Sequence, residues 1–441
     1  MATPLNILVY NVKFGRSHSN YIGRIADLLV DAGHNVTSLI PEMNPSVFDG
    51  TTKSKIIRFA HYFGDMFTKK CEALLDDAET LKQLKDAKFD VVISEAVDYC
   101  GIAVSRSSPP RSLLDRLRNA MDESIGSYTM NKAQTMFTEL FRSRFGAEYP
   151  DMKYLLTRSV FHFTNSEPLL DFARPILPKV IGLGGLGAQA PKRLDEEWEG
   201  ILKERKTNVL MSFGSVAQSA KMPMDSKRAV LEVFSRISDV TFIWKYEEID
   251  DAFATGEAAL VLNVKLVKWT PQNDLLADPR LTMFISHGGA GSTFECAIHG
   301  KPAILIPLFA DQPRNAGMLA HAGLGVVFDK FDLVDEAKFE GAIREVLGNA
   351  AYTEAARKTS ALLAKRPYAP EEVLVKHVEF AGVSGPIETM IPGSIGQPIV
   401  EYYMLDVIVI IIIGVISCLS VFFFMISKAI AKYRALKPKN D

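Results

Sequence analysis

A glycine-rich segment between two apolar stretches carries the residue types best suited to chemistry. Residues 281–285 predict an apolar strand, and the run SHGGAGS from Ser286 to Ser292 leads into a predicted helix. Glycines let the backbone approach an anion, and a helix N-terminus supplies free N–H groups and a positive dipole end. His287 and Ser292 can donate hydrogen bonds to phosphate oxygens, and Glu295 can accept them from sugar hydroxyls. The residues indicate a nucleoside diphosphate site, with a structural glycine turn as the alternative.

A second candidate is His18, in the polar loop between a predicted strand at 5–10 and a predicted helix at 22–32. An imidazole with a pKa near neutrality can take a proton from a hydroxyl group, so His18 fits a general base. A structural histidine is the alternative. Glu95 and Asp98 follow a later predicted strand, and either carboxylate can orient the imidazole or form a salt bridge.

These residues need elements that bring them to the edges of a sheet. Apolar runs that alternate with amphipathic helical patterns predict an α/β fold with parallel sheets in both halves of the chain. Strands are predicted at 5–10, 35–40, 88–94, 208–212, 240–244, 261–267, 281–285 and 303–306, and helices within 111–145 and at 335–347. Open parallel sheets bind ligands at their carboxyl edges, so we expect two Rossmann-like domains that face a cleft.

A Pro/Gly-rich stretch at 174–193 separates the two halves. Gly182, Gly184 and Gly187 match a dinucleotide fingerprint, but Pro191 and no clear helix follow where such a site needs one. We therefore interpret the stretch as a linker. The expected organisation is a first domain at 1–180, a linker at 181–193, a second domain at 194–385, a transmembrane helix at 405–427 and a basic tail at 428–441.

The composition is typical of a globular chain. Its 441 residues, 48% hydrophobic and 23% charged, are enough for about two domains. The net charge of -2 gives no reason to expect nucleic acid as a partner. The four cysteines are far apart and form no CxxC pair, so neither a metal cluster nor a disulfide framework is expected.

One segment near the C-terminus predicts a membrane span. Residues 407–426 contain no charge, and a helix of that length crosses about 30 Å of hydrocarbon; a buried core helix is the alternative. Acidic residues precede the segment and basic residues follow it, so the positive-inside rule predicts a cytoplasmic tail, with the domains on the other side. Lys437 and Lys439 resemble the dilysine retrieval signal of endoplasmic-reticulum proteins, with a generic basic flank as the alternative.

The N-terminus conflicts with that topology. The chain begins MATP and shows neither the basic region nor the long apolar run of a signal peptide. Either the true start lies upstream, or the chain is inserted by its tail and faces the cytosol. The second option would place the basic tail on the wrong side of the membrane.

A longer pattern surrounds the glycine-rich segment. It consists of WTPQ at 269–272, HGG at 287–289, Ser292, Glu295, GKP at 300–302, Pro307 and DQ at 311–312. The pattern resembles the signature motif of family 1 UDP-glycosyltransferases, which include the animal glucuronosyltransferases. The resemblance extends over nearly the whole chain, which looks most like a nematode or other invertebrate member. It implies the GT-B fold, with an acceptor-binding first domain and a UDP-sugar-binding second domain.

The resemblance also implies roles for the residues of the donor site. Trp269 would stack on uracil beside Gln272, and Glu295 would accept hydrogen bonds from the ribose. The implied diphosphate ligands are Ser286, His287 and Ser292, with Gly214, Ser215, Gly289 and Gly291 near the phosphates, and Asp311 and Gln312 would hold the sugar. Taken singly, Trp269 fits a core aromatic and Asp311 a helix N-cap. Gly291 departs from the family, where many members have Asn, so one side-chain contact is lost.

The implied reaction is a single inverting displacement. His18 aligns with the family's catalytic base, and Glu95 takes the position of its orienting Asp. His18 would deprotonate a hydroxyl of a small lipophilic acceptor, which attacks the anomeric carbon from the face opposite UDP. The family needs no metal, and the UDP-sugar is a co-substrate rather than a cofactor. The transferred sugar can be glucuronosyl or glucosyl, because both classes carry the Asp311–Gln312 pair.

The first domain is shorter than the resemblance predicts. After Val104 the chain passes directly to Ser105, where family members carry a further strand and connecting loops. A missing strand would leave an unpaired edge or a gap in the core. Two alternatives to an active conjugating enzyme therefore stay open: a catalytically impaired UDP-sugar-binding membrane protein, and a different two-domain transferase or sugar epimerase. A homo-oligomer is compatible with each.

Overall fold

The computed structural model describes residues 3–11, 13, 16–42, 47–60, 73–94, 128 and 131–436. The chain divides into two compact units, residues 1–386 and residues 387–441. The larger unit holds two main parallel sheets, and the smaller one holds the C-terminal helices.

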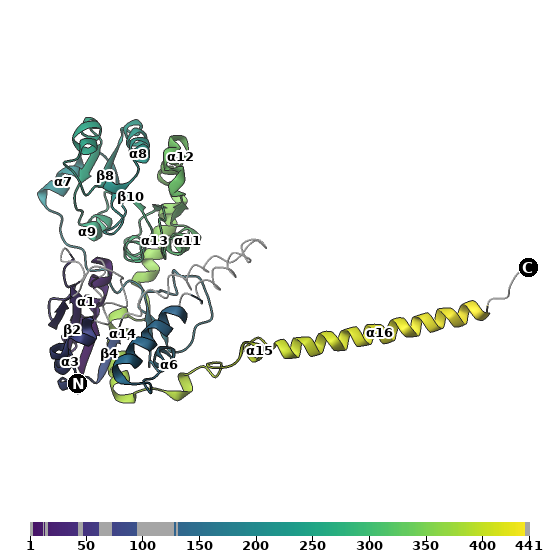
Figure 1. Ribbon diagram of the computed structural model, residues 1–441. Coiled ribbons are helices and arrows are strands. Elements are labelled where there is room, and N and C mark those ends of the chain that lie inside the picture. The colour runs from purple at the N-terminus through teal and green to yellow at the C-terminus, as the bar shows by residue number, and fades with distance from the viewer. Residues whose placement is uncertain are drawn as a thin grey trace, which may run out of the picture. The chain divides into compact units, whose positions relative to one another are not determined.

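The first half of the larger unit is built on a four-stranded parallel sheet of order β3-β2-β1-β4. Figure 1 labels β2 and β4 of this sheet, together with α1 and α3. Its elements are β1 (Asn6–Tyr10), α1 (Arg16–Asp31), β2 (Asn35–Glu42), β3 (Lys55–Ala60), α3 (Ala78–Asp86) and β4 (Val91–Ser94). Buried Ile25 and Leu29 of α1 pack against Ile7 and Val9 of β1. The strand order reverses between β1 and β4, so these two parallel strands end at the switch point of the sheet.

Among the described residues, the first sheet ends at β4, whose Val92 is exposed. The next strands, β5 (His162–Thr164) and β6 (Val180–Gly182), form a separate two-stranded parallel sheet after α6 (Met152–Thr157). Residues 131–145 are helical, as predicted for this part of 111–145. Glu95, Asp98 and the Val104–Ser105 junction lie outside the described residues, so the predictions made for them stay predictions.

The second half contains a six-stranded parallel sheet of order β12-β11-β10-β7-β8-β9. Its strands are β7 (Thr207–Ser212), β8 (Val240–Lys245), β9 (Val264–Val267), β10 (Leu281–Ser286), β11 (Ala303–Leu305) and β12 (Gly325–Val327). Its helices are α7 (Glu196–Lys203), α8 (Met224–Arg236), α9 (Gln272–Ala277), α10 (Ala290–Ile298), α11 (Gln312–His321), α12 (Glu336–Gly348) and α13 (Ala350–Ala364). The order reverses between β7 and β10, which is where a doubly wound sheet binds its ligands.

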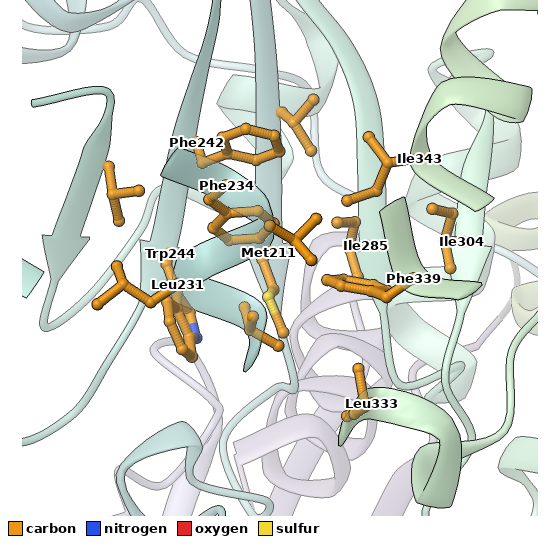
Figure 2. Packing of buried hydrophobic residues seen from close by; sticks show 14 of the residues in the cluster. Met211, Leu231, Phe234, Phe242, Trp244, Ile285, Ile304, Leu333, Phe339 and Ile343 are labelled. Carbon is orange, nitrogen blue, oxygen red and sulfur yellow. The ribbon is translucent and has the colours of Figure 1, made fainter. Parts of the chain in front are cut away.

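An aromatic core holds this sheet against its helices (Figure 2). The rings of Phe234 and Phe242 stack with centroids 3.8 Å apart, and Trp244 meets Phe234 edge-on at 6.0 Å. Phe339 of α12 packs against Phe234 at 6.1 Å. Such fully buried rings contribute a large apolar area to stability, so the strands that carry the site rest on a rigid base.

The last helix of the larger unit, α14 (Pro370–Ser384), packs in the core of the first sheet. Its Leu374 and Val378 are buried in the same cluster as Ile7. The predicted boundary at 385 assigns this helix to the second domain, whereas its buried side chains lie in the first core. Residues 1–386 form one unit, so the division into two domains stays a prediction.

The smaller unit contains α15 (Ile399–Tyr402) and the long α16 (Leu405–Leu436). In the described part of the chain, α16 is the one helix whose length and apolar composition suffice to cross a membrane, over Leu405–Tyr433. Its range includes the segment predicted from sequence.

Candidate active site

The two central strands of the second sheet, β7 and β10, end in the same kind of turn. The Ser212 hydroxyl accepts a hydrogen bond from the Gly214 amide at 3.4 Å, and the Ser286 hydroxyl accepts one from the Gly288 amide at 3.3 Å. Both glycines are left-handed, with φ of 80° and 78°. An L side chain is strained in this conformation, so the sequence needs glycine at both turns. The turns lie at the switch point of the sheet.

The imidazole of His287 lies between these turns. A β-carbon on Gly214 would lie 2.8 Å from His287 Cε1, and one on Gly289 would lie 2.6 Å from Nε2, so both positions require glycine. Burial and, to a smaller extent, the Lys245 ammonium lower the pKa of His287 to about 4, against an opposing effect of the Ser212 carbonyl. The ring is therefore neutral at neutral pH. Nδ1 is buried and has no hydrogen-bond partner within the described residues.

Lys245, at the end of β8, belongs to this arrangement. Its buried ammonium donates to the Gly214 carbonyl at 2.8 Å and to Glu247 Oε1 at 2.5 Å, and it lies 5.5 Å from the centroid of the Trp269 ring. We did not predict this residue from sequence. The available signal was a lysine directly after the apolar run of β8, where a parallel strand delivers its last side chain to the ligand edge.

Three predicted donor-site residues form one hydrogen-bonded group across α9 and α10. Nε2 of Gln272 donates to Ser292 Oγ at 3.0 Å and to Glu295 Oε2 at 2.7 Å. Burial raises the pKa of Glu295; Gln272 opposes this shift and Asp274 adds to it. In the described structure no side chain caps the N-terminus of α10, so its first amides face the glycine turn that precedes them. Free amides at a helix N-terminus favour an anion.

Asp311 and Gln312 lie at the start of α11, behind the same turn. Asp311 occupies the N-cap position without capping the helix; its carboxylate instead accepts a 2.6 Å bond from Asn315, which also donates to the Gly288 carbonyl at 3.0 Å. Oε1 of Gln312 accepts the amides of Leu308 and Phe309 at 2.8 and 3.1 Å, which leaves its Nε2 as the polar group suited to a ligand.

The backbone just before this pair is strained, because Ala310 has a φ of 56°. A non-glycine residue in this region carries a conformational cost that the surrounding structure must hold in place. Here the bonds of Gln312 to the amides of Leu308 and Phe309, before Ala310, and the bond of Asp311 to Asn315, after it, hold the backbone in place. Both side chains are therefore fixed before any ligand arrives.

The first turn of α1 reaches the second half of the unit at Trp269. The indole is 54% exposed, and the guanidinium carbon of Arg16 lies 4.3 Å from the ring centroid. His18 lies in the same turn and is half-buried, so it belongs to α1 and not to the preceding loop, where the sequence placed it; the helix begins six residues earlier than predicted. The structure thus brings α1, which carries the predicted general base His18, to Trp269, the residue predicted to stack on uracil. Ser215 follows Gly214 at the end of β7 and is half-buried.

Gly291, in the first turn of α10, has open space around it, because a β-carbon there would meet nothing within 4 Å. Among the described residues, no group of three His, Cys, Asp or Glu side chains is placed to hold a metal ion. The absence of a metal requirement stays a prediction.

Comparison with known proteins identifies the family. The profile of UDP-glucuronosyl and UDP-glucosyl transferases matches residues 31–111 and 99–439. The chain belongs to this family, and it is a UDP-glycosyltransferase of the glucuronosyltransferase kind. The two matches meet at 99–111, around the junction where the sequence predicts a missing segment.

Relatives and a solved structure agree with this assignment. The Caenorhabditis elegans protein ugt-48 is 27% identical over 93% of this chain and 92% of its own length. UDP-glucuronosyltransferase 3A1 of Bos taurus is 26% identical over 90% of this chain and 88% of its own. The crystal structure of the glycotransferase of kitacinnamycin covers 88% of this chain and 100% of its own, with a TM-score of 0.58 and 19% identity. That likeness concerns the fold, which is the predicted GT-B arrangement of two Rossmann-like sheets.

Proposed function

We propose that the ends of β7, β8 and β10 form the UDP-sugar site and that the first turn of α1 supplies the catalytic base. The observation that carries this proposal is the contact of Arg16 with Trp269 at 4.3 Å. It brings the turn that contains His18 to the exposed indole on which a uracil ring can stack. The general base must lie beside the donor site, because removal of the acceptor's proton and attack on the donor sugar occur in one step.

The donor's nucleotide is held by groups with complementary charge. Uracil stacks on Trp269 beside Gln272, and Glu295 accepts hydrogen bonds from the ribose. The diphosphate lies at the N-terminus of α10, between the imidazole of His287 and the ammonium of Lys245. These donors, with Ser286, Ser292 and the backbone groups of Gly214, Ser215, Gly289 and Gly291, stabilise the negative charge that builds up on UDP as the bond to the sugar breaks. Asp311 and the free Nε2 of Gln312 hold the sugar.

His18 takes the proton of an acceptor hydroxyl, whose oxygen attacks the anomeric carbon opposite the departing UDP. Glu95, directly after β4, orients the imidazole. The reaction therefore inverts the anomeric configuration, and it proceeds without a metal ion. Chelation with EDTA should leave turnover unchanged, and a loss of turnover in EDTA would contradict the metal-free mechanism.

The acceptor we propose is a small lipophilic hydroxyl compound, and the transferred group is glucuronosyl or glucosyl. Conjugation of such compounds would make the enzyme part of detoxification. The test is a screen of the full chain with UDP-glucose and UDP-glucuronate against a panel of phenols, with NMR of the product's anomeric proton. A β-linked product from an α-linked donor supports the proposal, whereas a retained configuration contradicts it.

The second candidate is a catalytically impaired UDP-sugar-binding membrane protein. The observation in its favour is the end of the first sheet at β4 in the described structure, with Val92 exposed. The same screen separates the two candidates. UDP binding without product from any donor and acceptor would favour the impaired protein.

The helix α16 anchors the enzyme in a bilayer. We propose the endoplasmic reticulum, with residues 1–386 in the lumen and the basic tail in the cytoplasm. Protease treatment of sealed microsomes tests the orientation, because a C-terminal epitope should be lost while the larger unit is protected. Protection of the epitope and loss of the larger unit would reverse the topology.

A further inference from the structure

Arg16 is held by an aromatic ring rather than by a carboxylate. Its guanidinium carbon lies 4.3 Å from the centroid of Trp269, and within the described chain no ion pair involves Arg16. Arg16 and Trp269 come from opposite halves of the larger unit. An arginine over an indole is a favourable cation–π contact, and Arg16 is two residues before His18 in the same helical turn.

The distance between the Arg16 guanidinium and the Trp269 indole leaves no room for a nucleobase between them. A flat ring sandwiched between guanidinium and indole needs about 3.5 Å on each side, or about 7 Å in total. The observed separation of 4.3 Å is that of direct contact. The ring face that Arg16 covers is therefore closed to a nucleobase until the arginine moves.

We propose that Arg16 controls access of the donor's nucleobase to Trp269. Uracil takes the ring by displacing the guanidinium, which is then free to pair with the donor's diphosphate. This inference rests on the proposed role of Trp269 in base stacking. It assigns to Arg16 a positioning function that couples arrival of the donor to the turn that carries His18.

The charges around the ring favour this exchange for a diphosphate. The Lys245 ammonium lies 5.5 Å from the same ring, so two cations approach one indole while one carboxylate, Glu247, bonds Lys245. A diphosphate brings negative charge to both cations, which offsets the loss of the arginine's contact with Trp269. Uridine must displace Arg16 without this compensation.

The test is calorimetric titration of the detergent-solubilised full chain with uridine and with UDP. Arg16→Ala should bind uridine about 2- to 5-fold more tightly than the natural enzyme, because one competitor for the ring is removed. The preference for UDP over uridine should shrink, because one cation is lost. Arg16→Lys should have a uridine affinity and a UDP preference between those of Arg16→Ala and the natural enzyme. Damage to the fold does not tighten binding, so a purely structural role predicts the opposite sign.

Two further variants separate the failure of this inference from the failure of the proposed function. Trp269→Ala should lose uridine binding; if it binds uridine as the natural enzyme does, the base-stacking site is wrong. If Trp269→Ala loses binding while Arg16→Ala binds uridine equally or more weakly, the access role of Arg16 alone is overturned. Arg344→Ala is the control, because Arg344 pairs with Glu340 on the exposed face of α12 and should change neither affinity.

Discussion

The carboxylate of Glu295 accepts a 2.7 Å hydrogen bond from the side-chain amide of Gln272, which joins α9 to α10 beside the exposed indole of Trp269. Burial raises the pKa of this carboxyl, whereas Gln272 acts to keep it ionised. Gln272 thus orients one carboxylate oxygen and leaves the other for a ligand. This arrangement fits an acceptor for a pair of ribose hydroxyls.

Replacing Glu295 with Gln tests this role. The amide oxygen can still accept from Gln272, but the charge that strengthens the bonds to ribose is gone. We expect UDP affinity to fall about 10-fold. The sharper measurement compares uridine with 2′,3′-dideoxyuridine, between which the variant should discriminate less. Glu354→Gln, an exposed position on α13, is the control. Equal discrimination by Glu295→Gln and the natural enzyme would remove Glu295 from the ribose site.

Gly214→Ala should damage the site in two ways. The left-handed backbone costs an L residue about 1–2 kcal/mol, and the new methyl group would lie 2.8 Å from the His287 ring. We expect a lower Tm and weaker UDP binding. Gly200→Ala in α7 is the matched control, because its methyl group meets nothing within 4 Å and alanine favours a helix. A Gly214→Ala variant that binds UDP normally would show that the turn need not contact His287.

Gly291→Asn should improve the donor site. The position is open, so the side chain fits without displacing a neighbour, and its amide can donate to a phosphate oxygen. We expect UDP to bind about 3- to 10-fold more tightly, in keeping with one added hydrogen bond, while uridine affinity stays constant. Gly341→Asn, equally open on α12, should change neither. Tighter binding of uridine as well would place the effect away from the phosphates.

His287 links UDP binding to pH. In the free enzyme its pKa is about 4, because the ring is buried and Lys245 is near. A bound diphosphate favours the protonated ring and raises this pKa, so UDP binding takes up a proton and tightens as the pH falls toward the free ring's value of about 4. Titrations in buffers with different ionisation enthalpies measure the proton uptake. His287→Gln should lose the proton uptake that His287 contributes and keep only the uptake by UDP itself. Equal proton uptake in the variant and the natural enzyme would contradict the assignment to His287.

The second half of the larger unit was accessible from sequence because its signals are local. A strand, a glycine turn and a helix follow one another at residues 281–298, and Gly289 is required by its contact with the ring of nearby His287. Lys245 escaped prediction because its partners, Gly214 and Trp269, are close only in the folded sheet. The contact between Arg16 and Trp269 could not be predicted from sequence for the same reason.

The first half was harder to predict. The pattern of β1, α1 and β2 is regular, and Gly33, with a φ of 94°, follows the end of α1. The placement of α14 was not visible, because an amphipathic helix does not show which of two sheets it will cover. Its packing with α1 and β4 depends on the chain's return to the first sheet after the second is complete.

In the proposed mechanism, His18 is the base that removes the acceptor's proton beside the donor site. His18→Ala should lower kcat by about 100- to 10,000-fold, because proton transfer in the transition state is lost. Its Kd for UDP should change little, because the residue is not expected to bind the donor.

The decisive measurement is therefore kcat and the Kd for UDP of His18→Ala, in the full chain, with the best donor and acceptor from the screen. A large loss of kcat with an unchanged Kd supports the account. Turnover equal to that of the natural enzyme would falsify it, and a parallel loss of UDP binding would show that His18 serves the donor site rather than the chemical step.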